Sequence, residues 1–427
     1  MIDTGRAPAL WDRAGWMFRR WVGLAAVAAL ISLAASCGRP SAPPAPAPAP
    51  APTGDRDAAR RDSLARVRAA FTADSLRRVD AYRDTATVRF CAGGDLTLGT
   101  NLDTSWTKIV SKRLHRPVAA LPAADSLVAP LRTLFAGADF ALVNVEGAIG
   151  DGEPPFDKCA NTTSGCFALR MPERAARAIR AVSKQTVVAN LANNHARDAG
   201  AEGLRETQRL LERAGVIVTG VDTLPTLAVT RHGDTVAFLG FATSGGDNDL
   251  RDLDAVRRHV ARAAAQNRRV IVTMHLGAEG ASAQRTLDST ERYLDAPRGN
   301  PVAFADAAVA AGADLVIGHG PHVVRAVEWR DSSLVLYSLG NLLTYGPFSH
   351  REPMRRGVVA CATVNGHGAV HDVRLRSTMQ HAPGRVATDR SRRALTLIDS
   401  LSRLDFPRTG AHVARDGRVT RLSPSIR

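Results

Sequence analysis

Residues 186–195 read Thr-Val-Val-Ala-Asn-Leu-Ala-Asn-Asn-His, a short apolar run that ends in amide side chains and an imidazole. The same order of an apolar run followed by polar side chains recurs along the chain, in runs at 86–92, 140–143, 270–274, 315–317 and 334–337. Continuous apolar runs of this length are typical of strands buried on both faces. The pattern therefore predicts a buried sheet with polar groups at its strand ends.

Segments with helical periodicity separate most of these strands, at residues 126–136, 173–183, 201–214, 253–266 and 302–311. Strands that alternate with helices favour the α/β class, in which helices cover the sheet. Two later apolar runs, 358–363 and 369–375, flank a turn at residues 365–368. We expect them to complete a second sheet, and we expect the domain to cover residues 86–385.

The polar side chains at the strand ends form one chemical set. In chain order they are Asp95, Asn144, Glu146, Asn194, His275, His319 and His322. In open α/β sheets, sites form beyond the carboxyl ends of the strands, and carboxylates, amides and imidazoles are ligands for divalent metals. A single such residue is more often a turn former or a structural histidine. Their recurrence at six strand ends predicts a shared metal site.

Six motifs at these positions resemble those of the CapA family of capsule (poly-γ-glutamate) biosynthesis proteins. They are Gly-Asp-Leu-Thr-Leu-Gly at 94–99, Asn-Val-Glu at 144–146, Ala-Asn-Asn-His-Ala-Arg-Asp-Ala-Gly at 192–200, His-Leu-Gly-Ala-Glu at 275–279, Gly-His-Gly-Pro-His-Val at 318–323 and Tyr-Ser-Leu-Gly-Asn at 337–341. They occur in the family's order, with Leu276 where the family carries Trp. The resemblance covers residues 86–380.

This resemblance implies a metallophosphatase-like (calcineurin-type) fold, a four-layer α-β-β-α sandwich that holds metal between two sheets. It implies metal ligands at Asp95, Glu146, Asn194, His275, His319 and His322, with Glu146 as the bridging carboxylate. The expected cofactor is one or two divalent ions of Mn, Zn or Fe. Metallophosphatases begin with Asp-x-His, but Thr97 stands at the histidine position here. One ligand fewer permits a mononuclear or a non-catalytic site.

The same resemblance gives roles to residues around the metal. His195 would be the catalytic outer histidine, and Glu279 would orient a ligand or act as an acid. Asn144, Asp198 and Asn341 would be further site residues. Asp198 is also a good helix N-cap, and Asn341 could simply cap a turn.

The first 37 residues predict a lipoprotein-type signal peptide. Arginines precede an apolar run at 21–33 that is short for a membrane span, and small residues lead to Cys37. This resembles a bacterial lipobox, with Ala34 where Leu is usual, so we expect Cys37 to be lipidated. The alternative is an ordinary signal peptide. A lipoprotein-type signal peptide would lead to export and to membrane anchoring, in the periplasm or at the cell surface.

Three further segments flank the domain. Residues 38–54 are a Pro/Ala-rich linker, which is stiff and extended. Residues 55–85 place scattered apolar side chains among Arg and Asp and predict a charged helical stalk. Residues 386–427 form an Arg/Ser-rich C-terminal tail, in which we expect one helix at 391–404 and a flexible end.

The cysteines fit no zinc-ribbon spacing. Cys159 and Cys166 flank a short polar loop, which predicts a local disulfide in an oxidising compartment. Cys91 and Cys361 lie inside apolar runs, and we interpret them as buried small hydrophobic residues.

The formal net charge is +15, and nearly all of the positive charge is arginine. This charge suits an acidic polymer or anionic lipid, but a GC-rich coding bias produces the same excess. No basic stripe alternates with aromatic residues, so a nucleic-acid partner is not expected.

Three functions remain open from the sequence. The first is a metal-dependent hydrolase of phosphoester or amide bonds outside the cytoplasm. The second is a non-catalytic accessory protein that binds an acidic polymer during its export, together with polymer-synthesis membrane proteins. The third is a structural anchor with a decayed site.

Overall fold

The computed structural model describes residues 86–102, 104–118, 124–156, 158–159, 166–243, 246, 248–346, 348 and 350–422, with residues 66 and 69. The predicted signal peptide, Cys37, the linker and nearly all of the stalk lie outside the described residues. The chain divides into two units, Met1–Arg68 and Ala69–Arg427, and both large sheets belong to the second. Among the described helices, none has the length and apolar character needed to cross a membrane.

The first large sheet has eight strands. Its order is β18 (Arg385–Thr388), β17 (Val370–His381), β16 (Arg356–Val364), β1 (Val88–Thr97), β2 (Phe140–Val145), β5 (Thr186–Asn190) and β6 (Ile217–Thr219), and β15 (Asn341–Thr344) also pairs with β1. The neighbours from β1 through β2 and β5 to β6 are parallel, as is the β1–β15 pair. The strands from β16 to β18 add an antiparallel edge.

The second large sheet has six strands. Its order is β13 (Val327–Arg330), β14 (Ser333–Leu336), β12 (Leu315–His319), β9 (Val270–His275), β8 (Thr235–Ala242) and β7 (Thr226–Val229). The four central strands are parallel, and β7 and β13 are antiparallel edges. The expected second sheet therefore exists. However, the apolar runs at 358–363 and 369–375, predicted to complete it, form β16 and β17 of the first sheet.

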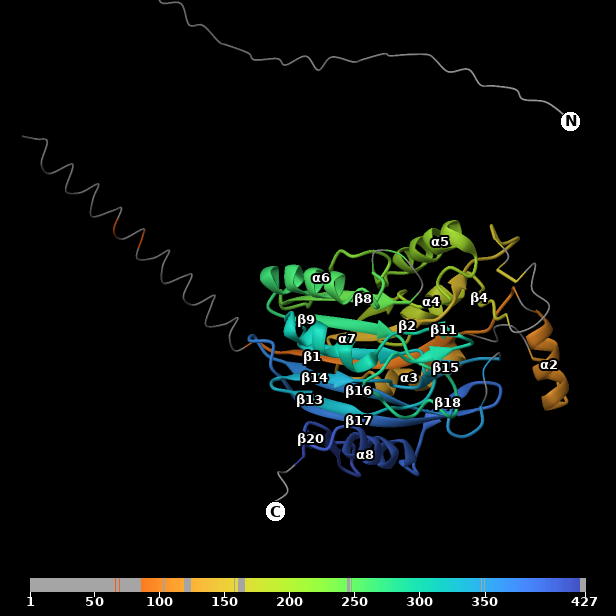
Figure 1. Ribbon diagram of the computed structural model, residues 1–427. Coiled ribbons are helices and arrows are strands. Elements are labelled where there is room, and N and C mark those ends of the chain that lie inside the picture. The colour runs from red at the N-terminus through yellow and green to blue at the C-terminus, as the bar shows by residue number, and fades with distance from the viewer. Residues whose placement is uncertain are drawn as a thin grey trace, which may run out of the picture. The chain divides into compact units, whose positions relative to one another are not determined.

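Helices cover the outer faces of both sheets (Figure 1). One apolar cluster joins α3 (Ala124–Leu134), α4 (Ala175–Arg180) and α5 (Gly200–Arg213) to the first sheet. Another joins α6 (Leu253–Gln266) and α7 (Pro301–Ala310) to the second sheet. The remaining described helices are α2 (Thr104–Leu114) and α8 (Arg393–Asp405).

The two sheets pack against each other through their inner faces. Phe238 of β8 lies 5.8 Å, between ring centroids, from both Phe90 of β1 and Phe140 of β2. Alternate residues of one strand serve different layers: Phe90 faces the other sheet, and Cys91 faces the helices. Burial on both faces explains why these strands read as continuous apolar runs.

The C-terminal segment is part of this packing as far as it is described, up to residue 422. Helix α8 forms close to the predicted 391–404, and β19 (Ala411–Val413) pairs with β20 (Val419–Arg421). Ala394, Ile398 and Val413 are buried in the inter-sheet cluster. These few apolar positions, which stand among arginines in the sequence, pack the segment against the sheets.

Three short strand pairs complete the described elements. The parallel pair is β3 (Ala148–Ile149) and β4 (Arg170–Met171). The antiparallel pairs are β10 (Arg292–Tyr293) with β11 (Ala296–Pro297), and β19 with β20.

Cys91 and Cys361 are fully buried, as expected, but they also form a disulfide. They lie opposite each other in the antiparallel pair of β1 and β16. They were expected to be separate buried residues because each lies inside an apolar run, whereas the structure joins them across 270 residues of sequence. The structure also joins Cys159 to Cys166 by a disulfide.

Candidate metal centre

Asp95 lies near the carboxyl end of β1, at the centre of the first sheet. The strand was expected to end before Gly93. It instead continues to Thr97, with an irregular register against β2. Gly94 permits this path, because a Cβ there would lie 1.7 Å from the carbonyl oxygen of Gly340. Asp95 is paired in register with Asn144 on one side and Asn341 on the other. The sheet thus places one carboxylate between two amides.

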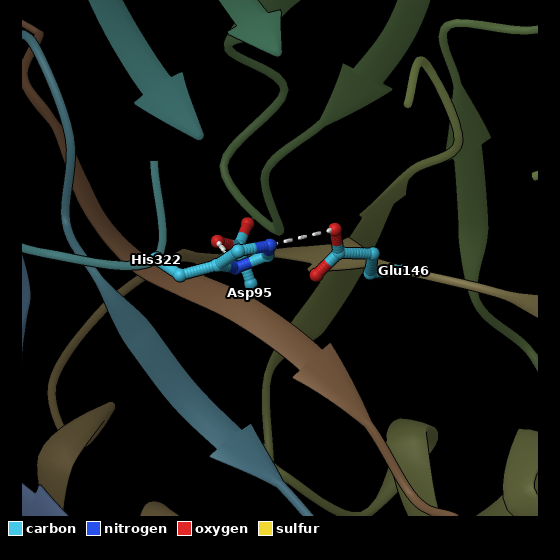
Figure 2. A group of neighbouring side chains, drawn as sticks. All are labelled: Asp95, Glu146 and His322. Carbon is cyan, nitrogen blue, oxygen red and sulfur yellow. Dashed lines mark hydrogen bonds and ion pairs between the residues drawn. The ribbon is translucent and has the colours of Figure 1, made fainter. Parts of the chain in front are cut away.

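Asp95, Glu146 and His322 form a buried group whose ligand atoms all lie within 4.8 Å of one another. Figure 2 shows the three side chains directed toward a common point. His322 Nδ1 lies 3.0 Å from Asp95 Oδ2 and 3.1 Å from Asn341 Oδ1. Since both neighbours are oxygen atoms, Nδ1 is the donor, and Nε2 faces Glu146 Oε1 at 3.6 Å.

The second sheet contributes His275 and His319, the last residues of β9 and β12. They are paired in register, because β9 and β12 are parallel neighbours. His275 Nε2 lies 3.8 Å from Glu146 Oε1, and His319 Nδ1 lies 3.7 Å from Asp95 Oδ1. Both imidazoles therefore reach across to the carboxylates of the first sheet.

Several ligand-type atoms at this junction are buried and unpaired. Within the described part of the chain, no hydrogen-bond partner is found for both oxygens of Glu146, Nε2 of His275 and both ring nitrogens of His319. Oδ1 of Asn194, the residue before His195, is also buried and unpaired. Each buried polar atom left unpaired costs about 1–3 kcal/mol, and native proteins tolerate few of them. A divalent cation would satisfy these atoms, and the mixture of carboxylate, amide and imidazole suits Mn²⁺, Zn²⁺ or Fe.

The pKa shifts follow from burial and from the charges that face one another in the site. Burial raises the pKa of Glu146 well above its ordinary value. Burial also lowers the pKa of His275, and it lowers that of His319 to about 4, which favours the neutral, metal-binding imidazole. For Asp95, burial is outweighed by the hydrogen bond and charge of His322, so its pKa falls. Burial is likewise outweighed at His322, where Glu146 and Asp95 raise the pKa.

A ladder of asparagine side chains supports the carboxylates. Asn144 donates through Nδ2 to Asp95 Oδ1 at 2.9 Å, and the same nitrogen lies 3.2 Å from His275 Nδ1. Asn144 Oδ1 in turn accepts from Asn190 at 2.9 Å and from Asn193 at 3.3 Å. Asn190 and Asn193 had no role in the sequence analysis. Their signal was present, because both lie in the strand-end stretch 186–195.

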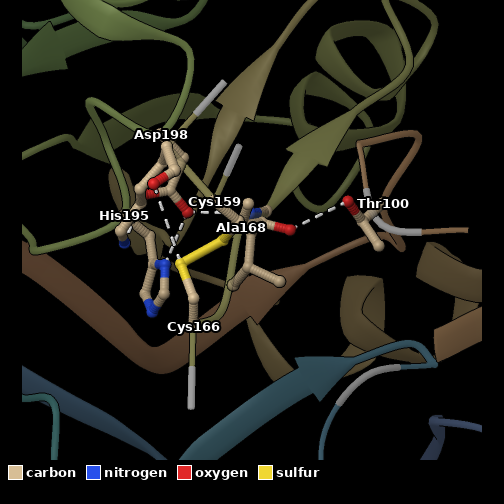
Figure 3. Close-up of a disulfide and its surroundings, with 8 residues drawn as sticks. Thr100, Cys159, Cys166, Ala168, His195 and Asp198 are labelled. Carbon is tan, nitrogen blue, oxygen red and sulfur yellow. Dashed lines mark hydrogen bonds and ion pairs between the residues drawn. A yellow bond between two sulfur atoms is a disulfide. The ribbon is translucent and has the colours of Figure 1, made fainter. Parts of the chain in front are cut away.

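His195 follows directly after Asn194 and is held by Asp198. Its Nδ1 lies 2.6 Å from Asp198 Oδ2, which also accepts from the backbone N–H of Leu169 at 2.7 Å. Lys158 donates to the other oxygen of Asp198 at 2.6 Å. Figure 3 shows His195 and Asp198 beside the Cys159–Cys166 disulfide. Asp198 therefore orients His195 and does not serve as the side-chain cap of α5.

Glu279 and Asn341 also lie next to the centre. Glu279 Oε2 is 3.6 Å from His322 Nε2, and Glu279 Oε1 is 2.7 Å from Arg298 NH2. Asn341 contacts His322 through Oδ1 and donates through Nδ2 to the carbonyl of Met354 at 3.1 Å. Arg298 is a further neighbour that the sequence analysis did not identify, since it lies in no motif.

The sequence profile of the family described as "Bacterial capsule synthesis protein PGA_cap" matches residues 89–345. "Capsule biosynthesis protein CapA" of Bacillus anthracis is 29% identical over 175 residues, which are 36% of this chain and 39% of that protein. "PGA biosynthesis protein CapA" of Bacillus subtilis (strain 168) is 23% identical over 251 residues, 55% of this chain and 61% of that protein. The chain thus matches less than two thirds of the length of either relative.

Two solved structures resemble the chain at low TM-scores. "GAP50 the anchor in the inner membrane complex of Plasmodium" has a TM-score of 0.32 and 10% identity, covering 74% of this chain and 95% of that one. The Haemophilus influenzae NAD nucleotidase (NadN) has a TM-score of 0.30 and 12% identity, covering 74% of this chain and 56% of that one.

Proposed function

We propose that this chain, which belongs to the bacterial capsule synthesis protein (CapA) family, acts in poly-γ-glutamate production as an extracytoplasmic, metal-dependent hydrolase. The family membership rests on the match over residues 89–345. The metal, the hydrolytic activity and the membrane anchor are our proposals. So is the assignment of the two-sheet architecture to the metallophosphatase-like superfamily.

The observation that carries the proposal is the set of unpaired ligand atoms where the two sheets meet. Glu146, His275 and His319 are each at most 1% exposed, so water cannot satisfy these atoms from the surface. They come from the ends of strands in both sheets, and they lie around Asp95 and His322. We assign Asp95, Glu146, Asn194, His275, His319 and His322 as ligands of one or two ions.

A bound divalent ion would act as a Lewis acid and lower the pKa of a coordinated water toward neutrality. The residues of the chain would supply orientation and proton transfer. Asn144 fixes the carboxylate of Asp95, and Asp198 fixes the ring of His195 so that it can contact a leaving group. Glu279 lies within 3.6 Å of His322 and could hold a ligand or donate a proton. The substrate class is a phosphoester.

The location of the chain is the second part of the proposal. Disulfides persist mainly in oxidising compartments outside the cytoplasm, and both disulfides of the structure fit that environment. Export would follow from residues 1–37, and a lipid on Cys37 would tether the domain through the linker at 38–54. Polymer-synthesis membrane proteins would then be its neighbours.

A non-catalytic role in binding the acidic polymer is the second candidate. Two observations favour it: the net charge of +15 and the Thr97 that stands where metallophosphatases carry a histidine ligand. A site with one ligand fewer could hold an ion without turnover.

The test is metal content and turnover of the purified chain after His319→Ala and Asn194→Ala. Even outer-shell partners of a metal contribute about 10–100-fold to affinity, so we expect each substitution to weaken metal binding at least that much. Metal analysis after dialysis measures this, and circular dichroism should show an unchanged fold. His371→Ala is the control, because that side chain is 44% exposed and pairs with Asp372 away from the centre.

Unchanged metal content in both variants would remove the ligand assignment. Metal that is bound without any turnover of generic phosphoesters would favour the polymer-binding role. Turnover that falls with the metal would support the hydrolase.

A further inference from the structure

Arg298 lies beside the metal centre with one edge of its guanidinium group unpaired. The residue is 7% exposed, and among the described residues no hydrogen-bond partner is found for its Nε and NH2 atoms. Glu279 Oε1 lies 2.7 Å from NH2. That oxygen also lacks an aligned hydrogen bond, so the two charges are close without satisfying each other's hydrogen-bonding capacity.

A second buried arginine nearby shows what a purely structural guanidinium looks like. Arg325 donates through Nε to the carbonyl of Ala283 at 2.7 Å, and through NH1 and NH2 to Glu291 at 2.9 and 2.7 Å. All three of its nitrogens therefore have partners within the protein. Arg298 differs because its Nε has no partner and its NH2 faces Glu279 without an aligned hydrogen bond. The Nε–NH2 edge of a guanidinium group binds planar oxyanions in a bidentate manner.

The backbone fixes Arg298 next to the metal-ligand loops. Its N–H donates to the carbonyl of Glu291 at 2.8 Å, and its carbonyl accepts from Gly277, two residues after His275, at 3.0 Å. The positive charge of Arg298 also acts on the metal centre. Burial raises the pKa of Glu146, and the charge of Arg298 opposes this rise. On its other side, the guanidinium carbon lies 5.9 Å from the ring centroid of the half-buried Tyr293.

We propose that Arg298 forms an oxyanion subsite beside the metal centre, in which its Nε–H and NH2 bind a phosphate or carboxylate group of the substrate. Tyr293 forms one wall of this subsite. The proposal deepens the proposed function, because it names an anionic group that the substrate presents next to the metal. The unpaired edge does not depend on metal, so the subsite can be tested separately.

The experiment is calorimetric binding of two probes to the purified, Mn²⁺-loaded chain. The probes are inorganic phosphate, for a phosphoryl group, and γ-glutamyl-glutamate, for a carboxylate. Because hydrogen bonds to a charged group are strong, we expect Arg298→Gln to weaken binding of the preferred probe roughly 10–100-fold. Arg298→Lys should retain part of the affinity, because lysine keeps the charge without the bidentate edge. The stronger probe identifies the anion.

The control is Arg292→Gln, since Arg292 is an exposed residue of the adjacent β10 strand. It should bind both probes as the unsubstituted chain does. If Arg298→Gln binds each probe as tightly as the unsubstituted chain does, the subsite proposal is overturned. So would metal loss or unfolding in both Arg298 variants, because Arg298 would then be structural.

Failure of the proposed function gives a different result. If the unsubstituted chain holds no metal, the hydrolase proposal fails, and the probes are applied to the metal-free chain. Binding that is lost in Arg298→Gln would then still support the subsite. Absence of any probe binding would overturn it.

Discussion

His322 combines an unusual backbone with a central position in the site. Its φ is 59°, in the left-handed region that residues with a side chain seldom adopt. Such conformations cost about 1–3 kcal/mol and persist where the surroundings impose them. Here Asp95 and Asn341 hold Nδ1, which leaves Nε2 facing Glu146 and Glu279. The strained backbone therefore serves to aim one nitrogen at the centre.

At the same scale, the orientation of His195 depends on Asp198. Asp198→Asn replaces one accepting oxygen by an NH2 group, so the side chain can no longer accept from Lys158, Leu169 and His195 together. We expect turnover of a phosphoester to fall about 10–100-fold, as for other outer-shell partners. Lys158→Gln should have a smaller effect, because Lys158 contacts the opposite oxygen of Asp198.

Hydrogen exchange gives a measurement of this prediction that does not require activity. The Leu169 amide donates to Asp198, so it should exchange faster in Asp198→Asn. Lys184→Gln, at an exposed lysine, is the control. A Leu169 amide that stays equally protected in Asp198→Asn would argue against this arrangement.

The proximity of the predicted ligands could be foreseen from the sequence better than the contacts that support them. Asp95, Glu146, His275, His319 and His322 could be predicted because each follows an apolar strand, and the structure brings them together. Arg298 and Asn190 could not be assigned, since their roles depend on which atoms remain unpaired or adjacent after folding. The residues of a hydrogen-bond ladder do not recur at a fixed spacing in the sequence, so the ladder cannot be predicted from a motif.

At the scale of an element, Asp314 makes the start of β12 sensitive to pH. Its Oδ2 accepts from the backbone N–H of Val270 at 2.7 Å. Burial nevertheless raises its pKa from 3.8 to about 7. Between these values the folded chain binds a proton that the unfolded chain does not, so the free energy of unfolding falls as the pH rises from about 4 to about 7.

Asp314→Asn should remove this part of the pH dependence. An asparagine keeps an oxygen to accept from Val270 but carries no charge. At pH 8 we expect the variant to be more stable than the unsubstituted chain, on the order of 2–4 kcal/mol. Urea unfolding at several pH values measures the difference, and below pH 4 the two chains should agree. A difference that does not change between pH 4 and pH 8 would refute the prediction.

Elements were predicted well where their pattern was simple. Helix α6 occupies the expected 253–266, and β9 and β12 begin at the expected residues. The strand β8 was missed, because Thr235–Ala242 ends in no motif. The end of β1 was placed too early, because glycines 93 and 94 suggested a turn. In the structure, Gly94 allows close approach to Gly340.

At the scale of the whole molecule, the site depends on the packing of the two sheets. Asp95 and Glu146 belong to the first sheet, and His275 and His319 belong to the second. No sequence pattern states how far apart two sheets lie. Phenylalanines from both sheets meet at the interface, and segments as remote as β1 and α8 share one core.

The Cys91–Cys361 disulfide joins the neighbouring strands β1 and β16, and its removal should destabilise the whole molecule. It links residues 270 apart, and a cross-link over so long a loop restricts the unfolded chain by roughly 5 kcal/mol in the chain-entropy model. Measured values are commonly about 2–5 kcal/mol. We expect the double variant Cys91→Ala with Cys361→Ala to lower the free energy of unfolding by about 2–5 kcal/mol. Unfolding in guanidinium measures this difference.

The second disulfide supplies the matched control for this prediction. Cys159 and Cys166 are separated by 7 residues, for which the same model gives only about 2 kcal/mol. Because this pair lies beside Lys158 and Asp198, and not in the core, Cys159→Ala with Cys166→Ala should affect global unfolding less. Equal losses in the two double variants would contradict the loop-length argument. The contrast arises because β16 returns, late in the chain, to pair with the first strand of the domain.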